Sequence, residues 1–346
     1  MKSNDGNRRK RGLLSAAAVI LAAATMIGGC SGSGSGDDRQ TKPEKTEAAG
    51  KTEPSDNTTM AKIKPEDVGH AMLEQKFAAI YSQFSAEFKQ QLSEQDFASL
   101  GEQFTQGVDS FDPVSSMRLN GIDKRGWLTP QGDRGIQAVF DTNENILGLQ
   151  MQYFEPQPER DNQLTKTEFD WPFHGDYFVY WGGNNPFINY HYAHESQQYA
   201  YDLSQVKDGM SYTGDAASNE SYFAFGQDIL APADGTVVTV VNDIADNSPV
   251  GVMNEKEPLG NVVIIDHGNG EYSYLAHLKQ GTATVQKGDQ VKRGDVIGKL
   301  GNSGNSSEPH LHFQVSDGAD LYESKSLPVR WKDGSRPVQG ETVSGS

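Results

Sequence analysis

The chain is organised around one stretch, which reads Glu308-Pro309-His310-Leu311-His312-Phe313-Gln314-Val315. Polar and apolar residues alternate in it, as they do in a β-strand that buries one face. Alternate side chains of a strand leave the same face about 6.6 Å apart, so we expect His310 and His312 to point the same way. Leu311 and Phe313 should then enter a core. One imidazole can bind a metal while the other reaches a water or a substrate atom beside it.

Further residues of metal-binding type precede this stretch. The run Tyr274-Leu275-Ala276-His277 supplies one histidine, and His191 and Asp202 lie further back. A bare His-x-His on a strand is more often a pair of surface residues. Seven of the eight histidines, however, fall between residues 174 and 312. This concentration favours a metal site over two unrelated surface residues.

Short β-rich runs separated by Gly and Asp surround these residues. They include residues 235–241, 261–265 and 272–275, with turns at Gly288-Asp289 and Gly294-Asp295. Short strands at close spacing predict a mainly β fold for residues 171–333. A glycine-rich phosphate loop followed by a helix is missing from the sequence, which argues against a dinucleotide-binding fold.

The order of the motifs in this region resembles that of the lysostaphin-type (LytM-like) zinc metallopeptidases. The motifs are Ala231-Pro232-Ala233-Asp234-Gly235-Thr236-Val237-Val238, Gly260-Asn261-Val262-Val263-Ile264-Ile265-Asp266-His267-Gly268, Tyr274-Leu275-Ala276-His277-Leu278, Val291-Lys292-Arg293-Gly294-Asp295-Val296-Ile297-Gly298, Gly304-Asn305-Ser306 and Pro309-His310-Leu311-His312-Phe313. The resemblance covers about residues 190–316 and implies an antiparallel β-sandwich. It also implies that His312 is a zinc ligand and that His310 and His277 are catalytic.

The family's usual first motif, a His and an Asp separated by three residues, is missing. The sequence between Asn189 and Asp202 instead resembles a branch of the family in which an enlarged turn separates the two ligands. This resemblance implies that His191 and Asp202 complete the ligand set, on neighbouring strands of a hairpin. His194 remains the alternative to His191. Glu308 stands where many members of the family have Gly.

The implied ligand set determines the expected chemistry. Two imidazoles and one carboxylate fill three tetrahedral positions of Zn²⁺ and leave the fourth for a water, as in catalytic zinc sites. The leading interpretation is a zinc endopeptidase that cuts peptide stems or cross-bridges of peptidoglycan. Two alternatives are an inactive zinc-binding relative that regulates other cell-wall hydrolases, and a carbohydrate- or peptide-binding module without metal. His70, His174 and His267 are expected to be structural.

The first thirty residues form an export signal. Basic residues are followed by the apolar run of residues 13–26, which is too short for a comfortable membrane span, and then by Ile27-Gly28-Gly29-Cys30. This order resembles the lipobox of bacterial lipoproteins, which implies a signal peptide over residues 1–29 and a lipidated Cys30. The alternative is a signal anchor that is retained. Cys30 is the only cysteine, so the chain cannot form an internal disulfide.

Residues 30–62 are polar and charged with almost no apolar side chains, and they predict a disordered tether. The whole chain has a formal net charge of −17, which argues against nucleic acid as a partner and against electrostatic adhesion to anionic lipid. Membrane attachment is therefore expected through the lipid alone. The predicted location is extracytoplasmic, on the outer face of the bacterial cell membrane.

Residues 63–156 predict a small α+β domain. Pro65-Glu66-Asp67 is a typical helix start, Met72 to Tyr81 have helical apolar spacing, and Ser93-Glu94-Gln95-Asp96 has the pattern of a capping box. Alternating apolar residues then predict strands over residues 136–140 and 147–153. This order resembles the nuclear-transport-factor-like fold, and we expect a spacer or a module with a protein partner. Residues 157–170 are predicted to be a linker and residues 334–346 a flexible tail.

Overall fold

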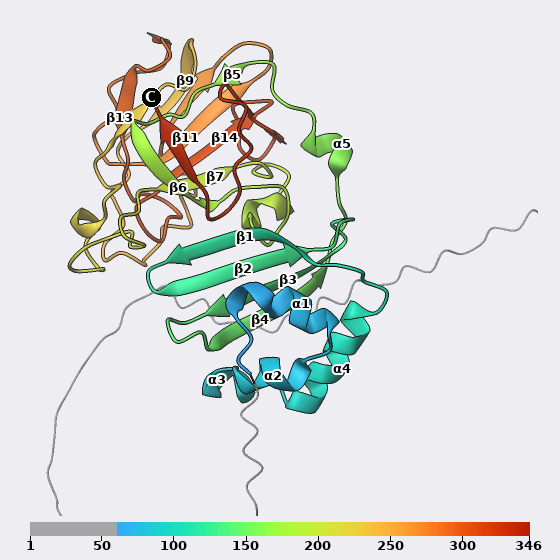
Figure 1. The fold of residues 1–346 in the computed structure, drawn as a ribbon. Coiled ribbons are helices and arrows are strands. Elements are labelled where there is room, and N and C mark those ends of the chain that lie inside the picture. Colours follow the sequence, from blue (N-terminus) through green and yellow to red (C-terminus); the bar gives the residue numbers. More distant parts are fainter. Residues whose placement is uncertain (1–60) are drawn as a thin grey trace, which may run out of the picture.

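The computed structural model describes residues 61–346 (Figure 1). The predicted signal peptide, Cys30 and nearly all of the predicted tether lie outside these residues. Within the described part of the chain, no helix is both long and apolar enough to cross a membrane.

The N-terminal region consists of short helices followed by an antiparallel sheet. The helices are η1 (Pro65–Asp67), α1 (Val68–Leu73), α2 (Phe77–Ser82), α3 (Ala86–Lys89) and α4 (Glu94–Thr105). The strands are β1 (Asp112–Leu119), β2 (Ile122–Leu128), β3 (Arg134–Phe140) and β4 (Ile146–Tyr153), paired in that order. The helices and the last two strands agree with the patterns in the sequence, whereas β1 and β2 were not predicted.

The apolar run from Met72 to Tyr81 forms two helices and not one. The chain turns between α1 and α2 at Gln75, whose φ of 56° no α-helix accommodates. The predicted cap of α4 is present, because the Ser93 hydroxyl accepts a hydrogen bond from the Asp96 backbone N–H at 3.2 Å. Phe97 and Phe104 of α4 are then buried on one face of that helix.

Helices α1–α4 cover one face of the sheet, while the C-terminal region lies against the other (Figure 1). The helix-side core is rich in aromatic residues. It includes Met72, Phe77, Ile80, Phe84, Phe88, Phe97, Trp127, Ile136, Ala138 and Phe140. Because strand side chains alternate, the neighbours of the core residues in β2 and β3 must face the C-terminal region.

A nine-stranded sheet dominates the C-terminal region. Its main path runs β12-β9-β10-β11-β14-β7-β6-β17, and β15 pairs with β14. The bounds are β6 (Gly175–Trp181), β7 (Tyr201–Ser204), β9 (Gly235–Val241), β10 (Asn261–Asp266), β11 (Tyr272–Leu278), β12 (Gln290–Val291), β14 (Leu311–Ser316), β15 (Ser326–Leu327) and β17 (Thr342–Gly345). Two short pairs complete the fold, antiparallel β8 (Asp228–Leu230) with β13 (Val296–Lys299) and parallel β5 (Glu168–Phe169) with β16 (Arg330–Trp331).

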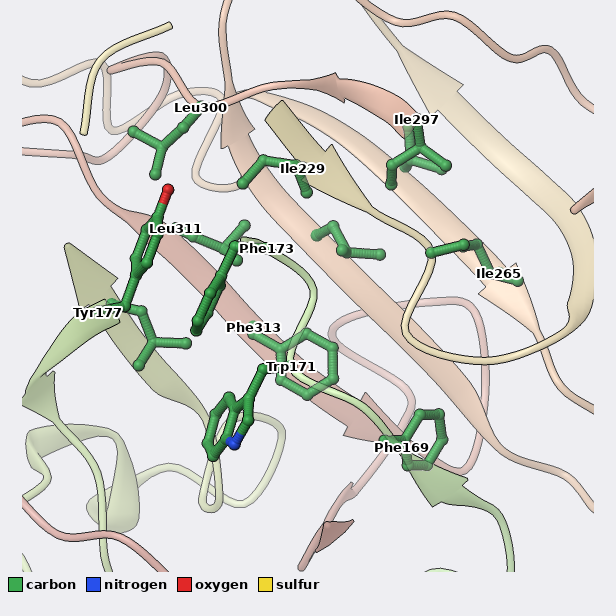
Figure 2. Close-up of a cluster of buried hydrophobic side chains, with 14 of the residues drawn as sticks. Phe169, Trp171, Phe173, Tyr177, Ile229, Ile265, Ile297, Leu300, Leu311 and Phe313 are labelled. Atoms are coloured by element: carbon green, nitrogen blue, oxygen red, sulfur yellow. The ribbon is translucent and has the colours of Figure 1, made fainter. Parts of the chain in front are cut away.

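The core of this region lies between the large sheet and the short pairs. Ile229 of β8 and Ile297 of β13 pack in one cluster with residues of the large sheet, among them Leu311 and Phe313 of β14 (Figure 2). The alternation predicted for the His-x-His stretch is therefore present, and it turns His312 to the opposite face of the sheet. The expected mainly β fold is confirmed, and the β5–β16 pair is a parallel departure from the antiparallel pairing of the large sheet.

The predicted linker and the predicted tail are both more ordered than expected. The predicted linker over residues 157–170 contains a short helix, α5 (Pro158–Asp161), and strand β5, whose Phe169 is fully buried. The predicted flexible tail is wrong for residues 342–345, because β17 pairs with β6 along its length. Its hydrogen-bond partners lie more than 160 residues earlier, so no local pattern in the tail could reveal the pairing.

Candidate metal centre

Three side chains converge from separate elements on the face of the large sheet opposite to Leu311 and Phe313. Asp202 on β7 lies directly across from His312 on β14, since the two are cross-strand partners. His191 comes from a single 3-10 turn, η2 (Tyr190–Ala193), in the loop before β7. One ligand atom from each residue lies within 4.8 Å of the others, and all three side chains are buried.

The position of His191 differs from the expected hairpin strand. The enlarged turn folds around the fully buried Asn189, whose side-chain oxygen accepts a hydrogen bond from the His191 N–H at 3.2 Å. The Asn189 amide donates to the Gly183 and Ala200 carbonyls, both at 3.1 Å. His194 at the end of the turn is exposed and is not part of the cluster. The geometry thus favours His191 over His194.

Each imidazole of the cluster has a glutamine side chain at one ring nitrogen and Asp202 at the other. His191 Nδ1 lies 3.0 Å from the Gln197 side-chain oxygen, and His312 Nε2 lies 2.9 Å from that of Gln314. In the tautomer that donates its N–H to the glutamine oxygen, the other ring nitrogen carries the lone pair. In both residues that nitrogen faces Asp202 at 3.0 Å. Two lone pairs and a carboxylate that face one another are the donor set of a cation site, and the residues present therefore fit Zn²⁺.

The electrostatics of the cluster are consistent with this set. Burial lowers the pKa of His191, which keeps the imidazole neutral and able to donate a lone pair. Burial alone would raise the pKa of Asp202, but the neighbouring imidazoles of His191 and His310 hold it well below its usual value. Asp202 is therefore anionic across the physiological range.

Two further histidines border the three-residue cluster. The His277 and His310 rings lie 4.8 Å apart, and His310 Nε2 is 3.6 Å from an Asp202 oxygen. Each donates its Nδ1–H to a backbone carbonyl at 2.8 Å, that of Ser303 for His277 and that of Glu308 for His310. Nε2 is thus left with a lone pair in both. Burial, followed by the potentials of His310 and His312, lowers the pKa of His277 well below its usual value.

The backbone at His277 adopts an uncommon conformation. Its φ is +61°, which few non-glycine residues adopt and which surrounding contacts must hold in place. Its N–H donates to the Leu259 carbonyl at 3.0 Å, and its carbonyl accepts from the Gly301 N–H at 3.1 Å. The positive φ interrupts the extended backbone near the end of β11, at the residue whose ring lies beside His310.

Sequence reasoning missed the residues that orient the histidines. Gln314 was recoverable, because it follows His312 by two positions and therefore shares its strand face. Gln197 and Asn189 were not, since they act across an irregular turn. Glu308, noted only as a departure from Gly, is a carboxyl with 6% exposure, and burial raises its pKa to about 7. Tyr190 stacks on His191 with the ring centroids 3.9 Å apart.

The remaining histidines lie outside the cluster. His267 contacts the Asp234 carbonyl and the Ser273 hydroxyl, and His174 contacts the Ser346 carbonyl. His70 is exposed and lies near Glu74 in the next helical turn. These contacts agree with the expected structural roles.

Part of the chain matches a known protein family. Residues 222–324 match the model of Peptidase family M23. The matched segment contains His277, His310 and His312. It does not reach His191 or Asp202, which the fold alone brings to the site.

Curated relatives match over similarly short segments. A peptidoglycan DD-endopeptidase, ShyA of Vibrio cholerae, is 42% identical over 67 residues, which is 19% of this chain and 15% of that protein. The DD-carboxypeptidase/endopeptidase Mpg of Neisseria meningitidis is 37% identical over 90 residues, 26% of this chain and 19% of that protein. The chain therefore spans less than a fifth of the length of either relative.

Among solved structures, the catalytic domain of lysostaphin from Staphylococcus simulans aligns with 50% of this chain and 95% of its own. The sequence identity is 20% and the TM-score 0.25. A putative M23 peptidase from Pseudomonas aeruginosa aligns with 62% of this chain and 72% of its own, at 18% identity and a TM-score of 0.29.

Proposed function

We propose that this protein is a zinc-dependent endopeptidase that hydrolyses peptide bonds in the stems or cross-bridges of peptidoglycan. The observation that carries the proposal is the set of free nitrogens of His191 and His312 facing Asp202, with His277 and His310 beside them. The match of residues 222–324 to Peptidase family M23 supports the same reaction. The substrate class comes from the relatives, which are a peptidoglycan DD-endopeptidase and a DD-carboxypeptidase/endopeptidase.

The proposed metal ligands are His191, Asp202 and His312. A Zn²⁺ ion held there would polarise a peptide carbonyl and lower the pKa of a water to about 7. The cross-strand pairing of Asp202 with His312 and the amide oxygens of Gln197 and Gln314 hold the ligands in place before any metal binds. Such preorganisation reduces the cost of ordering the site.

His310 and His277 are the proposed proton-transfer groups. Because each Nδ1–H is donated to a carbonyl, each Nε2 can accept a proton from an attacking water or hold one for the leaving amine. The lowered pKa of His277 keeps it neutral at pH 7, so it begins the cycle as an acceptor. Once protonated, either imidazolium can stabilise negative charge on the carbonyl oxygen.

The test separates ligands from proton-transfer groups. Single alanine variants of His191, Asp202 and His312 should lose zinc and cleavage together. His277→Ala and His310→Ala should keep close to one zinc per chain and lose about 10²–10⁴-fold in rate, the usual contribution of a general acid or base. Zinc is measured by elemental analysis of purified protein, and cleavage by mass spectrometry of peptides released from cell-wall preparations.

His194→Ala is the matched control, because His194 lies three residues from His191 but outside the cluster, and it should keep both properties. If His194→Ala loses zinc while His191→Ala does not, the ligand assignment is wrong. If the unmutated protein binds zinc but cleaves no peptidoglycan type, it is a regulator of other wall hydrolases. If it binds no metal, the proposed chemistry fails.

We also propose that the protein is exported and anchored by a lipid on Cys30 to the outer face of the cell membrane. The support is the order of basic, apolar and small residues before that single cysteine. Cys30→Ala should move the protein out of the membrane fraction or leave it unprocessed. Mass spectrometry of native protein that shows residue 1 and a free thiol would contradict the anchor.

A further inference from the structure

The sheet of the N-terminal region has a second face, which packs on the segment that carries His191. Gln137 of β3 donates its side-chain N–H to the Phe187 carbonyl at 2.8 Å. On β2, a Cβ at Gly126 would lie 4.0 Å from the Ile188 side chain, which therefore packs over the backbone of β2 there. Phe187 and Ile188 immediately precede η2. The sheet therefore contacts the metal-site turn and not a remote surface.

Lys124 on the same face of β2 lies at the start of a row of side chains that ends at the metal cluster. Only 9% of Lys124 is exposed, and burial lowers the pKa of its side-chain amine to about 7. It lies 4.1 Å from the centre of the Trp181 ring, within the range of a cation–π contact. The edge of Trp181 meets Tyr190, with centroids 5.1 Å apart.

Tyr190 completes the row. Its ring lies over His191 at 3.9 Å, and its hydroxyl approaches an Asp202 oxygen at 3.5 Å. Trp181 is also the backbone partner of Asp202 across the β6–β7 pair. A shift of Trp181 would therefore be passed through packed side chains to His191 and Asp202.

A second line of contacts runs from the β1–β2 turn toward His310. Asn120 has a φ of +49°, and its backbone N–H donates to the Gly209 carbonyl at 2.8 Å. Its side chain accepts from the Ser211 N–H at 2.9 Å and donates to the Ser211 hydroxyl at 3.0 Å. The buried Tyr180 hydroxyl lies near Ser204, Ser211 and Glu308 but has no hydrogen-bond partner among residues 61–346. Glu308 in turn holds His310 through its carbonyl.

The first line passes through Trp181 of β6 and is continuous to the metal cluster, whereas the hydrogen bonds of the second line end at Ser211. We propose that the N-terminal α+β region is a positioning element of the catalytic unit, in which Lys124, through Trp181 of β6 and Tyr190, keeps His191 and Asp202 in place for the metal. This inference rests on the proposed metal site. It differs from the spacer or partner-binding role that the sequence suggested for the same region.

The experiment measures zinc affinity in the full chain by competition with a chromophoric chelator. Lys124→Met keeps an unbranched apolar stem and removes the charge, while Lys124→Arg keeps a cation that stacks on indole. Asn120→Gly accommodates the positive φ but removes the bonds to Ser211. We expect Lys124→Met to weaken zinc binding about 10-fold, the lower end for partners of metal ligands, and Lys124→Arg to restore most of it. Asn120→Gly, whose contacts run toward His310 and not toward a ligand, should leave zinc affinity nearly unchanged.

The matched control is Lys89→Met. Lys89 also lies over an aromatic ring in the N-terminal region, 5.6 Å from the centre of Tyr81, but that ring is part of the helix-side cluster, away from β6. The zinc affinity of Lys89→Met should equal that of the unmutated protein.

The peptide-cleavage kcat of Lys124→Met should fall with KM nearly unchanged, because the variant disturbs the reacting centre and not the substrate contacts.

A readout without metal keeps the inference separate from the proposed function. In metal-free protein, the imidazole ¹H–¹⁵N resonances of His191 report the Nδ1–H bond to Gln197, and they should shift in Lys124→Met and not in Lys89→Met. If the unmutated protein binds no zinc, the function proposal fails while this spectrum still decides the positioning role. Unchanged zinc affinity and unchanged His191 resonances in Lys124→Met would overturn the inference, even if its melting temperature falls.

Discussion

Glu308 makes the stability of this protein depend on pH in a defined direction. Its side chain is 6% exposed, and burial raises its pKa from 4.5 to about 7. Folding therefore favours the protonated carboxyl. The contribution is fully present below the ordinary pKa of 4.5 and is lost as the pH rises through about 7. One pKa unit corresponds to 1.36 kcal/mol, so the full loss above that range is about 3 kcal/mol.

Glu308→Gln is the matching perturbation, since the amide resembles the protonated carboxyl in shape and stays neutral. We expect the two proteins to have similar free energies of unfolding at pH 4. At pH 8.5 the variant should have gained up to about 3 kcal/mol relative to the unmutated protein. Denaturant unfolding at four or five pH values measures this difference, and terms common to both proteins, including loss of metal at low pH, cancel.

Glu323→Gln is the control, because Glu323 is exposed and its variant should follow the unmutated protein at every pH. A difference between Glu308→Gln and the unmutated protein that stays constant from pH 4 to 8.5 would refute the reasoning. It would mean that the Glu308 carboxyl reaches water or a cation in solution.

Three further substitutions test other contacts. Asn189→Ala leaves buried carbonyls and the His191 N–H without partners, at about 1–3 kcal/mol for each unpaired group, so denaturant unfolding should show a loss of several kcal/mol and zinc affinity should fall with it. Gly260→Ala should destabilise the fold by more than 1 kcal/mol, because φ is +58° and the new Cβ would lie 2.4 Å from the Ser303 backbone; a thermal melt equal to that of the unmutated protein would contradict this. Ser93→Ala removes the cap of α4 and should cost about 1 kcal/mol in denaturant unfolding with zinc content unchanged.

The proposed site divides into a part that the sequence could reveal and a part that it could not. His310 and His312 were predictable because a strand has a period of two, and Leu311 and Phe313 fixed which face was buried. His277 was recoverable only through the resemblance, since its orientation depends on a positive φ that its sequence neighbours do not indicate. His191 is placed by a 3-10 turn around Asn189, and irregular turns leave no periodic signal.

The sequence by itself determined the local patterns of this protein: the alternation of the His-x-His strand, the Ser93 cap, the short strands of the C-terminal region and the charge that argues against nucleic acid. These features depend on neighbouring residues and their intrinsic preferences. Only the tertiary structure decided the pairing of Asp202 with His312, the return of β17 to β6 and the packing of Lys124 against Trp181. Each of these joins segments far apart in the chain. Such contacts depend on which faces and edges the rest of the fold leaves to be covered, and a single sequence does not specify that locally.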